Sequence, residues 1–201
     1  NSSTGWLHST FGQTIAATGR LASNNPNLQN IPIRTDRGKE IRKAFISRDS
    51  EHLILSADYS QIELRIIAAI TQDEGMMEAF HKGEDIHSST ASKVFGVPLD
   101  DVTKEMRRRA KAVNFGLAYG QSSFGLSQTL GISRSEPKEI IDNYFAKFPG
   151  IKKYMTNTIT FARENGYIET IMKRRRYLRD INSKNHTVRS QAERNAINSP
   201  I

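Results

Sequence analysis

The sequence predicts an α+β fold in which helices dominate the middle of the chain. Six helices are expected, one after another, at residues 75–82, 86–95, 103–118, 122–130, 136–147 and 150–164. Gly166 follows the last of them, and a glycine in this position is typical of a helix end. Short β-like segments occur in pairs on both sides of the helices, and such pairs with turn residues between them are typical of antiparallel hairpins.

The N-terminal part is expected to contain loops, one hairpin and the start of a helix. Residues 1–40 are rich in Gly, Pro, Asn and Thr, which favours loops. Residues 41–47 and 53–58 are β-like, and the turn-forming residues 48–51 between them predict an antiparallel hairpin. Ser60 is followed by Glu63 three positions later, a capping-box pattern that predicts a helix running to about Ile70.

The C-terminal part is expected to form a second hairpin and a closing helix. Residues 167–172 and 176–178 are β-like, and a strongly basic turn joins them. The closing helix is expected to begin near Thr187. These elements complete a chain in which β structure lies at both ends and helices lie between.

Composition limits the class of protein. Of the 201 residues, 37% are hydrophobic and 25% are charged, which is typical of a soluble globular chain. The longest apolar stretch, residues 62–70, is too short to cross a bilayer and is interrupted by Glu63 and Arg65. No signal peptide is visible, so we expect a cytoplasmic protein with no membrane contact. The chain has no cysteine, which excludes disulfides and thiolate zinc sites.

The net charge of +8 predicts a polyanionic partner. The basic residues gather in two clusters. The clusters consist of Lys104, Arg107, Arg108, Arg109 and Lys111, and of Lys173, Arg174, Arg175, Arg176 and Arg179. Either cluster alone could be a solvated helix face or a charged turn. Two clusters in so short a chain favour binding to nucleic acid or to nucleotide phosphates.

Asp58 stands where the expected strand ends and the expected helix is about to begin. A carboxylate held between two rigid elements, but still facing solvent, suits a hard cation such as Mg²⁺, which takes oxygen ligands. Two alternatives remain open at this point. Asp58 could simply cap the following helix, and Glu63 could simply be the capping-box partner of Ser60.

A row of four functional side chains, Arg107, Lys111, Phe115 and Tyr119, occurs at steps of four within residues 103–118 and just beyond. On a helix, this spacing places the first three on one face and Tyr119 near its edge. Two cations followed by aromatic rings suit a nucleoside triphosphate, with charge for the phosphates and a ring for the sugar or base. The alternative is an amphipathic core helix with basic flanks.

Five stretches resemble the family A DNA polymerases, the group of bacterial DNA polymerase I. Residues 58–65, DYSQIELR, resemble motif A of this family. Residues 107–120 contain RxxxKxxxFGxxYG, which resembles motif B on the fingers helix that receives the incoming nucleotide. TGRL at 18–21, PNLQNIP at 26–32 and Arg194-x-x-x-Asn198 also match, in the right order. The resemblance runs from about Thr18 to Ile201.

The resemblance implies template-directed DNA synthesis, in which a primer 3′-hydroxyl attacks the α-phosphate of a dNTP and pyrophosphate leaves. Two Mg²⁺ ions would stabilise the attacking and leaving oxygens. The implied partners are primer–template DNA and a dNTP, and the chain is expected to act as a monomer within a larger chain. The implied architecture is part of a polymerase right hand, with an incomplete antiparallel palm sheet. Residues 1–66 would form part of the palm, 67–165 the helical fingers, and 166–201 a return to the palm.

The resemblance also implies roles for individual residues. Asp58 would hold metal through its carboxylate and Tyr59 through its carbonyl, and Lys111 would be catalytic by protonating the departing pyrophosphate. Glu63 would be the steric gate that excludes a 2′-hydroxyl. The implied nucleotide-binding residues are Arg107, Lys111, Phe115, Tyr119, His87, Gln61 and Glu63. The implied DNA-binding residues are Arg20, Asn30, Arg194 and Asn198.

The chain departs from the family pattern at Ala69, where histidine is common, and at Arg179, where proline is usual. The third motif, which carries the second catalytic aspartate, is expected beyond Ile201, so the chain is expected to be a fragment that does not polymerise DNA by itself. Two alternatives are a single-subunit RNA polymerase and a non-catalytic DNA-binding module. Glu63 and Phe115 favour the deoxynucleotide hypothesis.

Overall fold

The structure is a computed structural model that describes residues 3–33, 35–121, 123–130 and 136–201. The chain forms two compact units, Asn1–Tyr59 and Ser60–Ile201, and each unit is described by itself. The first unit contains little regular structure. Its elements are β1 (Thr10–Gly12), β2 (Ala22–Asn24), a short 3-10 helix η1 (Leu28–Asn30) and α1 (Asp36–Arg42). β1 and β2 pair antiparallel, with Thr10 opposite Asn24, in a region expected to be loop.

The hairpin expected over residues 41–47 and 53–58 is wrong. Thr35 caps a helix instead, because its Oγ1 accepts the Gly38 N–H at 3.1 Å, and the resulting α1 extends to Arg42. Residues 53–58 form no strand, and Leu53 and Leu55 are 94% and 92% exposed. A strand needs a neighbouring strand and a buried face, and no described residue supplies either to this segment.

The second unit confirms the predicted helices to within one residue at each end, and it confirms the α+β class. Its elements are α2 (Ile62–Thr71), α3 (Glu74–His81), α4 (Ile86–Phe95), η2 (Leu99–Asp101), α5 (Lys104–Ala118), α6 (Ser123–Leu130), α7 (Glu136–Lys147), α8 (Pro149–Asn165), β3 (Tyr167–Glu169), β4 (Arg175–Tyr177) and α9 (His186–Asn198). The β3–β4 hairpin is antiparallel, with Ile168 opposite Arg176, as expected. Throughout the described residues, each helix is too short or too polar to span a lipid bilayer.

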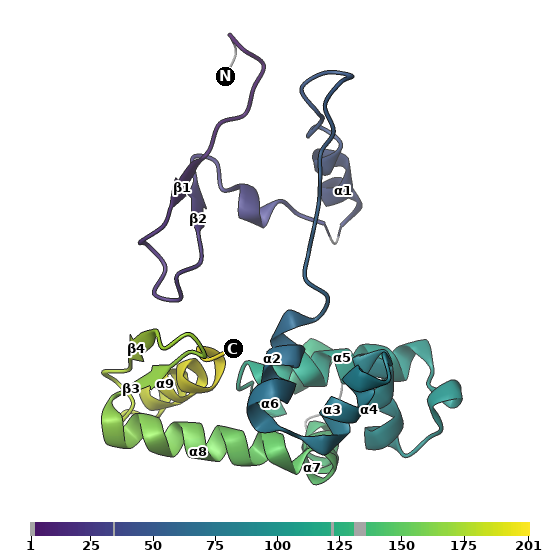
Figure 1. Cartoon of the computed structure of the whole chain (residues 1–201), viewed down its shortest axis with the longest axis vertical. Coiled ribbons are helices and arrows are strands. Elements are labelled where there is room, and N and C mark those ends of the chain that lie inside the picture. The colour runs from purple at the N-terminus through teal and green to yellow at the C-terminus, as the bar shows by residue number, and fades with distance from the viewer. Residues whose placement is uncertain (1–2, 34, 122, 131–135) are drawn as a thin grey trace. The chain divides into compact units, whose positions relative to one another are not determined.

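Two hydrophobic cores lie along α8, which contributes side chains to both. In Figure 1, α8 runs from α7 to the β3–β4 hairpin. The larger core gathers side chains from α2 to α8, and the smaller one lies between α8, the β3–β4 hairpin and α9. The largest fully buried side chains of the larger core are Leu64, Met76, Ile86, Val113, Leu126, Tyr144 and Phe148. Members of the smaller core are Ala162, Ile168, Leu178, Ile181, Ala192 and Ala196. Gly166, at φ +74°, ends α8 and turns the chain into β3.

One buried carboxylate joins the starts of two helices in the larger core. Asp73 Oδ1 accepts the N–H groups of Gly75 and Met76 at 3.1 and 3.3 Å, at the start of α3. Its Oδ2 accepts the Gly150 N–H at 2.9 Å, in the first turn of α8. Both helix dipoles present their positive ends to this charge, so Asp73 ties α3 to α8.

Replacing Asp73 tests this joint cap. We expect Asp73→Ala to lower the free energy of unfolding by about 1–3 kcal/mol, because buried N–H groups at two helix starts lose their acceptor. Asp73→Asn is expected to lose less, because asparagine can still cap α3. Urea denaturation of the chain measures both, with Asp142→Ala on exposed α7 surface as a control expected to change by less than about 0.5 kcal/mol. Equal stability of Asp73→Ala and the parent chain would contradict the joint cap.

Candidate functional site

Helix α5 carries the predicted row of side chains, and its opposite face is buried. Thr103 caps the helix, since its Oγ1 accepts the Met106 N–H at 3.2 Å. Val113 and Leu117 face the larger core and are buried. Lys111 is exposed and makes no hydrogen bond or ion pair with the described residues. Its ammonium group is therefore available to an anion.

Three aromatic rings continue the row. Phe115 and Tyr119 are stacked, with ring centroids 6.2 Å apart and an interplanar angle of 20°. His87, from the neighbouring helix α4, also lies against Phe115, with ring centroids 5.6 Å apart. The structure thus brings His87 to the α5 row, although the two segments are well separated in the sequence.

Arg107 is held by a carboxylate at the start of α4. Its Nε donates to Asp85 Oδ1 at 3.0 Å and its Nη2 donates to Asp85 Oδ2 at 2.8 Å, which is a two-pronged ion pair. Asp85 Oδ1 also accepts the Ser88 N–H at 2.8 Å and so caps α4. Burial raises the pKa of Asp85, but the hydrogen bonds from Arg107 and Ser88 outweigh burial and lower this pKa to about 2.

His87 is 3% exposed and is hydrogen-bonded within the α4–α5 contact. Its Nδ1 lies 3.1 Å from the Asn114 side-chain nitrogen. Burial lowers the pKa of His87, and the positive charges of Arg107 and Lys111 lower it further, while Asp85 acts in the opposite direction. The imidazole is therefore neutral at pH 7.

Three residues at this contact, Asp85, Thr90 and Asn114, were not among the predicted site residues. The Asn114 side-chain nitrogen donates to Thr90 Oγ1 at 3.0 Å as well as lying against His87. Asn114 has a signal in the sequence, because it is a polar residue on the apolar face that Val113 and Leu117 define. Asp85 also has one, since it directly precedes a helix as an N-cap residue does.

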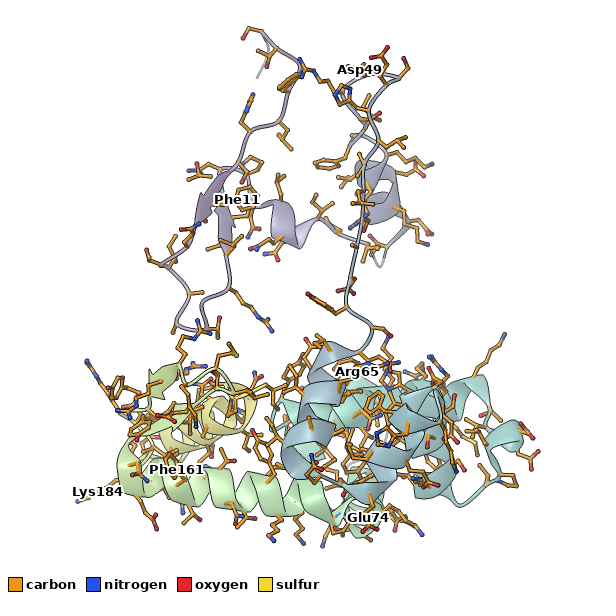
Figure 2. The ribbon with its side chains drawn as sticks, viewed as in Figure 1. Phe11, Asp49, Arg65, Glu74, Phe161 and Lys184 are labelled. Atoms are coloured by element: carbon orange, nitrogen blue, oxygen red, sulfur yellow. The ribbon has the colours of Figure 1, made fainter. Side chains whose placement is uncertain are left out.

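The start of α2 differs from the predicted capping box. Gln61, not Ser60, is the N-cap; it has a left-handed backbone at φ +54° and makes no side-chain capping bond. Glu63 is half-buried in the first turn, and its carboxylate makes no hydrogen bond with the described residues. Arg65, labelled in Figure 2, holds the residue before the helix instead, because its Nε donates to the Ser60 carbonyl at 3.0 Å. The Arg65 guanidinium also lies 4.7 Å from the centre of the Phe80 ring.

Helix α9 brings Arg194 against the end of α5. Gly120 has a left-handed backbone at φ +65°, and a Cβ added there would lie only 3.0 Å from Arg194 Cγ. Arg194 Nη2 donates to Gln191 Oε1 at 2.6 Å. Asn198 lies one helical turn further along α9 and is half-buried. Of the predicted DNA-binding residues, these two thus lie in the same unit as the α5 row.

The remaining predicted site residues lie in the first unit and are exposed. Asp58 and Tyr59 stand in an irregular segment, so the expected strand–helix junction is absent, and Tyr59 is 78% exposed. Arg20 and Asn30 are also exposed. Within the described parts of the chain, no group of three or more His, Cys, Asp or Glu side chains could hold a metal ion.

Comparison with known proteins agrees with the motifs. A family model described as DNA polymerase family A matches residues 1–201. The chain belongs to this family. It is 56% identical over 197 residues to DNA polymerase I of Mycobacterium bovis, and 54% identical over 198 residues to DNA polymerase I of Geobacillus stearothermophilus. Each match covers 98% of the chain but only 22% and 23% of these relatives, so the chain spans less than a quarter of their length.

A solved structure is similar to the chain as well. The POL domain of Pol1 from M. smegmatis, in complex with DNA primer-template and dNTP, shares 51% identity with it at a TM-score of 0.87. The match covers 96% of the chain and 34% of that domain. The family A resemblance drawn from the motifs is thus confirmed.

The Arg107–Asp85 pair predicts a pH dependence of stability. Because the pKa of Asp85 is lowered on folding, the unfolded chain binds more protons between about pH 4 and pH 2, and the stabilisation is lost as pH falls through this range. We expect Asp85→Asn, which retains a capping side chain, to be less stable than the parent at about pH 5 and to approach it near pH 2. Urea midpoints across this range measure the gap, and Asp142→Asn is the control. A gap that persists unchanged at low pH would contradict the assignment.

Proposed function

We propose that the chain supplies the nucleotide-binding surface of a DNA polymerase that adds dNTPs to a primer 3′-hydroxyl under the direction of a template. The observation that carries this proposal is the continuous row on α5, in which two cations precede two stacked rings and His87 joins from α4. Membership of DNA polymerase family A supports it. So does the similarity to a POL domain in complex with DNA primer-template and dNTP.

The cationic end of the row would bind the triphosphate. Lys111 is exposed and can donate to phosphate oxygens without first breaking an ion pair within the described residues. Arg107 would exchange the Asp85 carboxylate for a phosphate, because its guanidinium offers the same pair of donors to either anion. Lys111 would then give a proton to the departing pyrophosphate as a general acid. His87 would donate a further hydrogen bond to the phosphates.

The aromatic end of the row would meet the nucleoside. Phe115 would pack against the sugar and Tyr119 near the template base, which suits a stacked pair whose outer ring is partly exposed. Glu63 would exclude a ribose 2′-hydroxyl and Gln61 would contact the nucleotide. The capping alternative for Glu63 has no support, since Ser60 does not cap α2. Family membership also favours this hypothesis over an RNA polymerase.

Asp58 and the Tyr59 carbonyl would hold Mg²⁺. Both are hard oxygen donors of the kind this ion prefers, and the Asp58 side chain is exposed and without a hydrogen-bond partner among the described residues. Asp58 and Tyr59 would supply only some of the ligands. Two Mg²⁺ ions close together repel each other, and a single carboxylate does not offset that repulsion. When bound, two Mg²⁺ ions stabilise the attacking and leaving oxygens. Primer–template DNA would be contacted by Arg20, Asn30, Arg194 and Asn198.

A chimera tests the proposed function. The chain would replace the matching 198 residues of Geobacillus stearothermophilus DNA polymerase I. We expect the chimera to extend a primed template with Mg²⁺ and dNTPs, Asp58→Ala to abolish extension, and Asp101→Ala, at another exposed acid, to leave it unchanged. We expect no extension from the chain by itself. Extension that survives Asp58→Ala would refute the metal assignment, and dNTP-independent DNA binding without extension would favour the non-catalytic alternative.

The sugar gate predicts a change in nucleotide selectivity in the same chimera. Glu63→Ala is expected to raise ribonucleotide relative to deoxynucleotide incorporation at least about tenfold, since the volume that blocks the 2′-hydroxyl is removed and one lost contact of this kind is worth about 1.4 kcal/mol. Glu63→Gln keeps that volume and is the matched control. Single-turnover incorporation of one dNTP and its rNTP measures the ratio. An unchanged ratio in Glu63→Ala would remove the gate from the proposal.

A further inference from the structure

Asn114 is an exception on the buried face of α5. It is 1% exposed and lies among apolar core residues, where an amide is costly unless it is fully hydrogen-bonded. Its partners are both on α4, at His87 and Thr90. The amide therefore joins two helices at the point where His87 meets the α5 row.

Both polar atoms of the Asn114 amide lie against Thr90 on α4. The Asn114 Nδ2 donates to Thr90 Oγ1 at 3.0 Å. The Thr90 hydroxyl has the Ile86 carbonyl oxygen at 2.7 Å and Asn114 Oδ1 at 3.3 Å as its acceptors. The second hydrogen of the same Nδ2 points to His87 Nδ1 at 3.1 Å.

This arrangement determines where His87 carries its proton. A ring nitrogen that accepts from Asn114 has a free lone pair, so the proton of the neutral imidazole is on Nε2. Nε2 makes no hydrogen bond with the described residues, yet none of their buried side-chain nitrogens lacks a partner. Nε2 therefore reaches the surface of the otherwise buried ring, as a free N–H donor.

We infer that Asn114 is a positioning residue that holds His87 as the neutral Nε2–H tautomer, so that its one free N–H is a donor to the phosphates of the bound dNTP. This inference rests on the proposed function. It assigns to a buried amide a part in nucleotide binding, although the amide itself touches no substrate.

The charges around His87 keep this donor neutral rather than cationic. The charged groups that act on the ring are Asp85, the N-cap of α4, and Arg107 and Lys111 on α5; the described parts of α3, α7 and η2 contribute none. Burial and the two cations lower the pKa of His87, and only Asp85 raises it. At every pH above this pKa, the fixed tautomer presents an N–H at Nε2. An imidazole free to change tautomer would present a lone pair there for part of the time.

The variants are made in the chimeric polymerase described above. Asn114→Asp is nearly isosteric, but a carboxylate only accepts, so it draws the proton to His87 Nδ1 and raises the pKa of His87. Thr90→Val is a milder second variant, because it removes the acceptor that orients the amide. Val113→Ala, at the neighbouring buried position, controls for lost packing. His87→Ala reports how much His87 itself contributes.

Two measurements separate positioning from a structural role. Nitrogen-15 NMR of labelled histidine is expected to show the Nε2–H form in the parent and in Val113→Ala, the Nδ1–H form in Asn114→Asp, and a mixture in Thr90→Val. The KM for dNTP is expected to be flat between about pH 6 and pH 8.5 in the parent, as far as His87 contributes to it. In Asn114→Asp it is expected to rise about tenfold as pH increases over this range, because the deprotonated ring then presents a lone pair to the phosphates.

An unchanged tautomer in both Asn114→Asp and Thr90→Val would overturn the inference. A second outcome would also overturn the inference: Asn114→Asp changes the tautomer but its KM stays independent of pH, while His87→Ala raises KM. In that case the proposed nucleotide site stands, but Asn114 has no part in it. If His87→Ala leaves KM unchanged, His87 does not contact the phosphates, and both the inference and that part of the proposed function fail.

Discussion

The packing of α4 against α5 is the contact on which the candidate site depends. It places the His87 ring beside Phe115 and the Asp85 carboxylate beside Arg107, so that side chains from two helices form one row. Apolar packing alone would allow several rotations of α4 relative to α5. The hydrogen bonds from the buried amide of Asn114 to α4 form in only one of these rotations. Any other rotation would leave a buried amide without partners, which is costly.

The site holds its cations in two different ways. Arg107 is already engaged by Asp85, whereas Lys111 is open to solvent. A polyphosphate ligand can compete with Asp85 for Arg107, because a phosphate group also offers two acceptor oxygens to the guanidinium and carries more negative charge than one carboxylate. The Asp85 carboxylate does not become an isolated charge in that exchange, because it still caps α4 through the Ser88 N–H. The start of α4 thus keeps its cap when Arg107 is released.

The predicted helices match the structure, and the residues at their ends show why. Helix α4 is bounded by Asp85, an N-cap residue, and by Gly96 in a left-handed conformation, and α8 lies between Pro149 and Gly166. The expected hairpin over residues 41–58 failed for two physical reasons. The Thr35 cap starts a helix that runs into the first two residues of the expected strand, and the β-like residues 53–58 cannot form a ladder without a partner strand. The capping box failed because a left-handed residue, Gln61, precedes α2.

The sequence predicted the contacts within one helix of the candidate site, but not the contacts between helices. Spacing on one helix placed Arg107, Lys111 and Phe115 together, but nothing local indicates that His87 packs on Phe115, because that is a tertiary contact. The motif resemblance supplied His87 where periodicity could not. Neither route identified Asn114, whose partners can be named only when α4 and α5 are seen side by side.

The contact between Gly120 and Arg194 has a mechanical consequence. The backbone of Gly120 lies so close to α9 that even a Cβ there would come within 3.0 Å of Arg194 Cγ and 3.3 Å of Arg194 Cα. A shift of α9 toward α5 would therefore press on the backbone directly after Tyr119, the C-cap of α5, and so on the residue whose ring ends the α5 row.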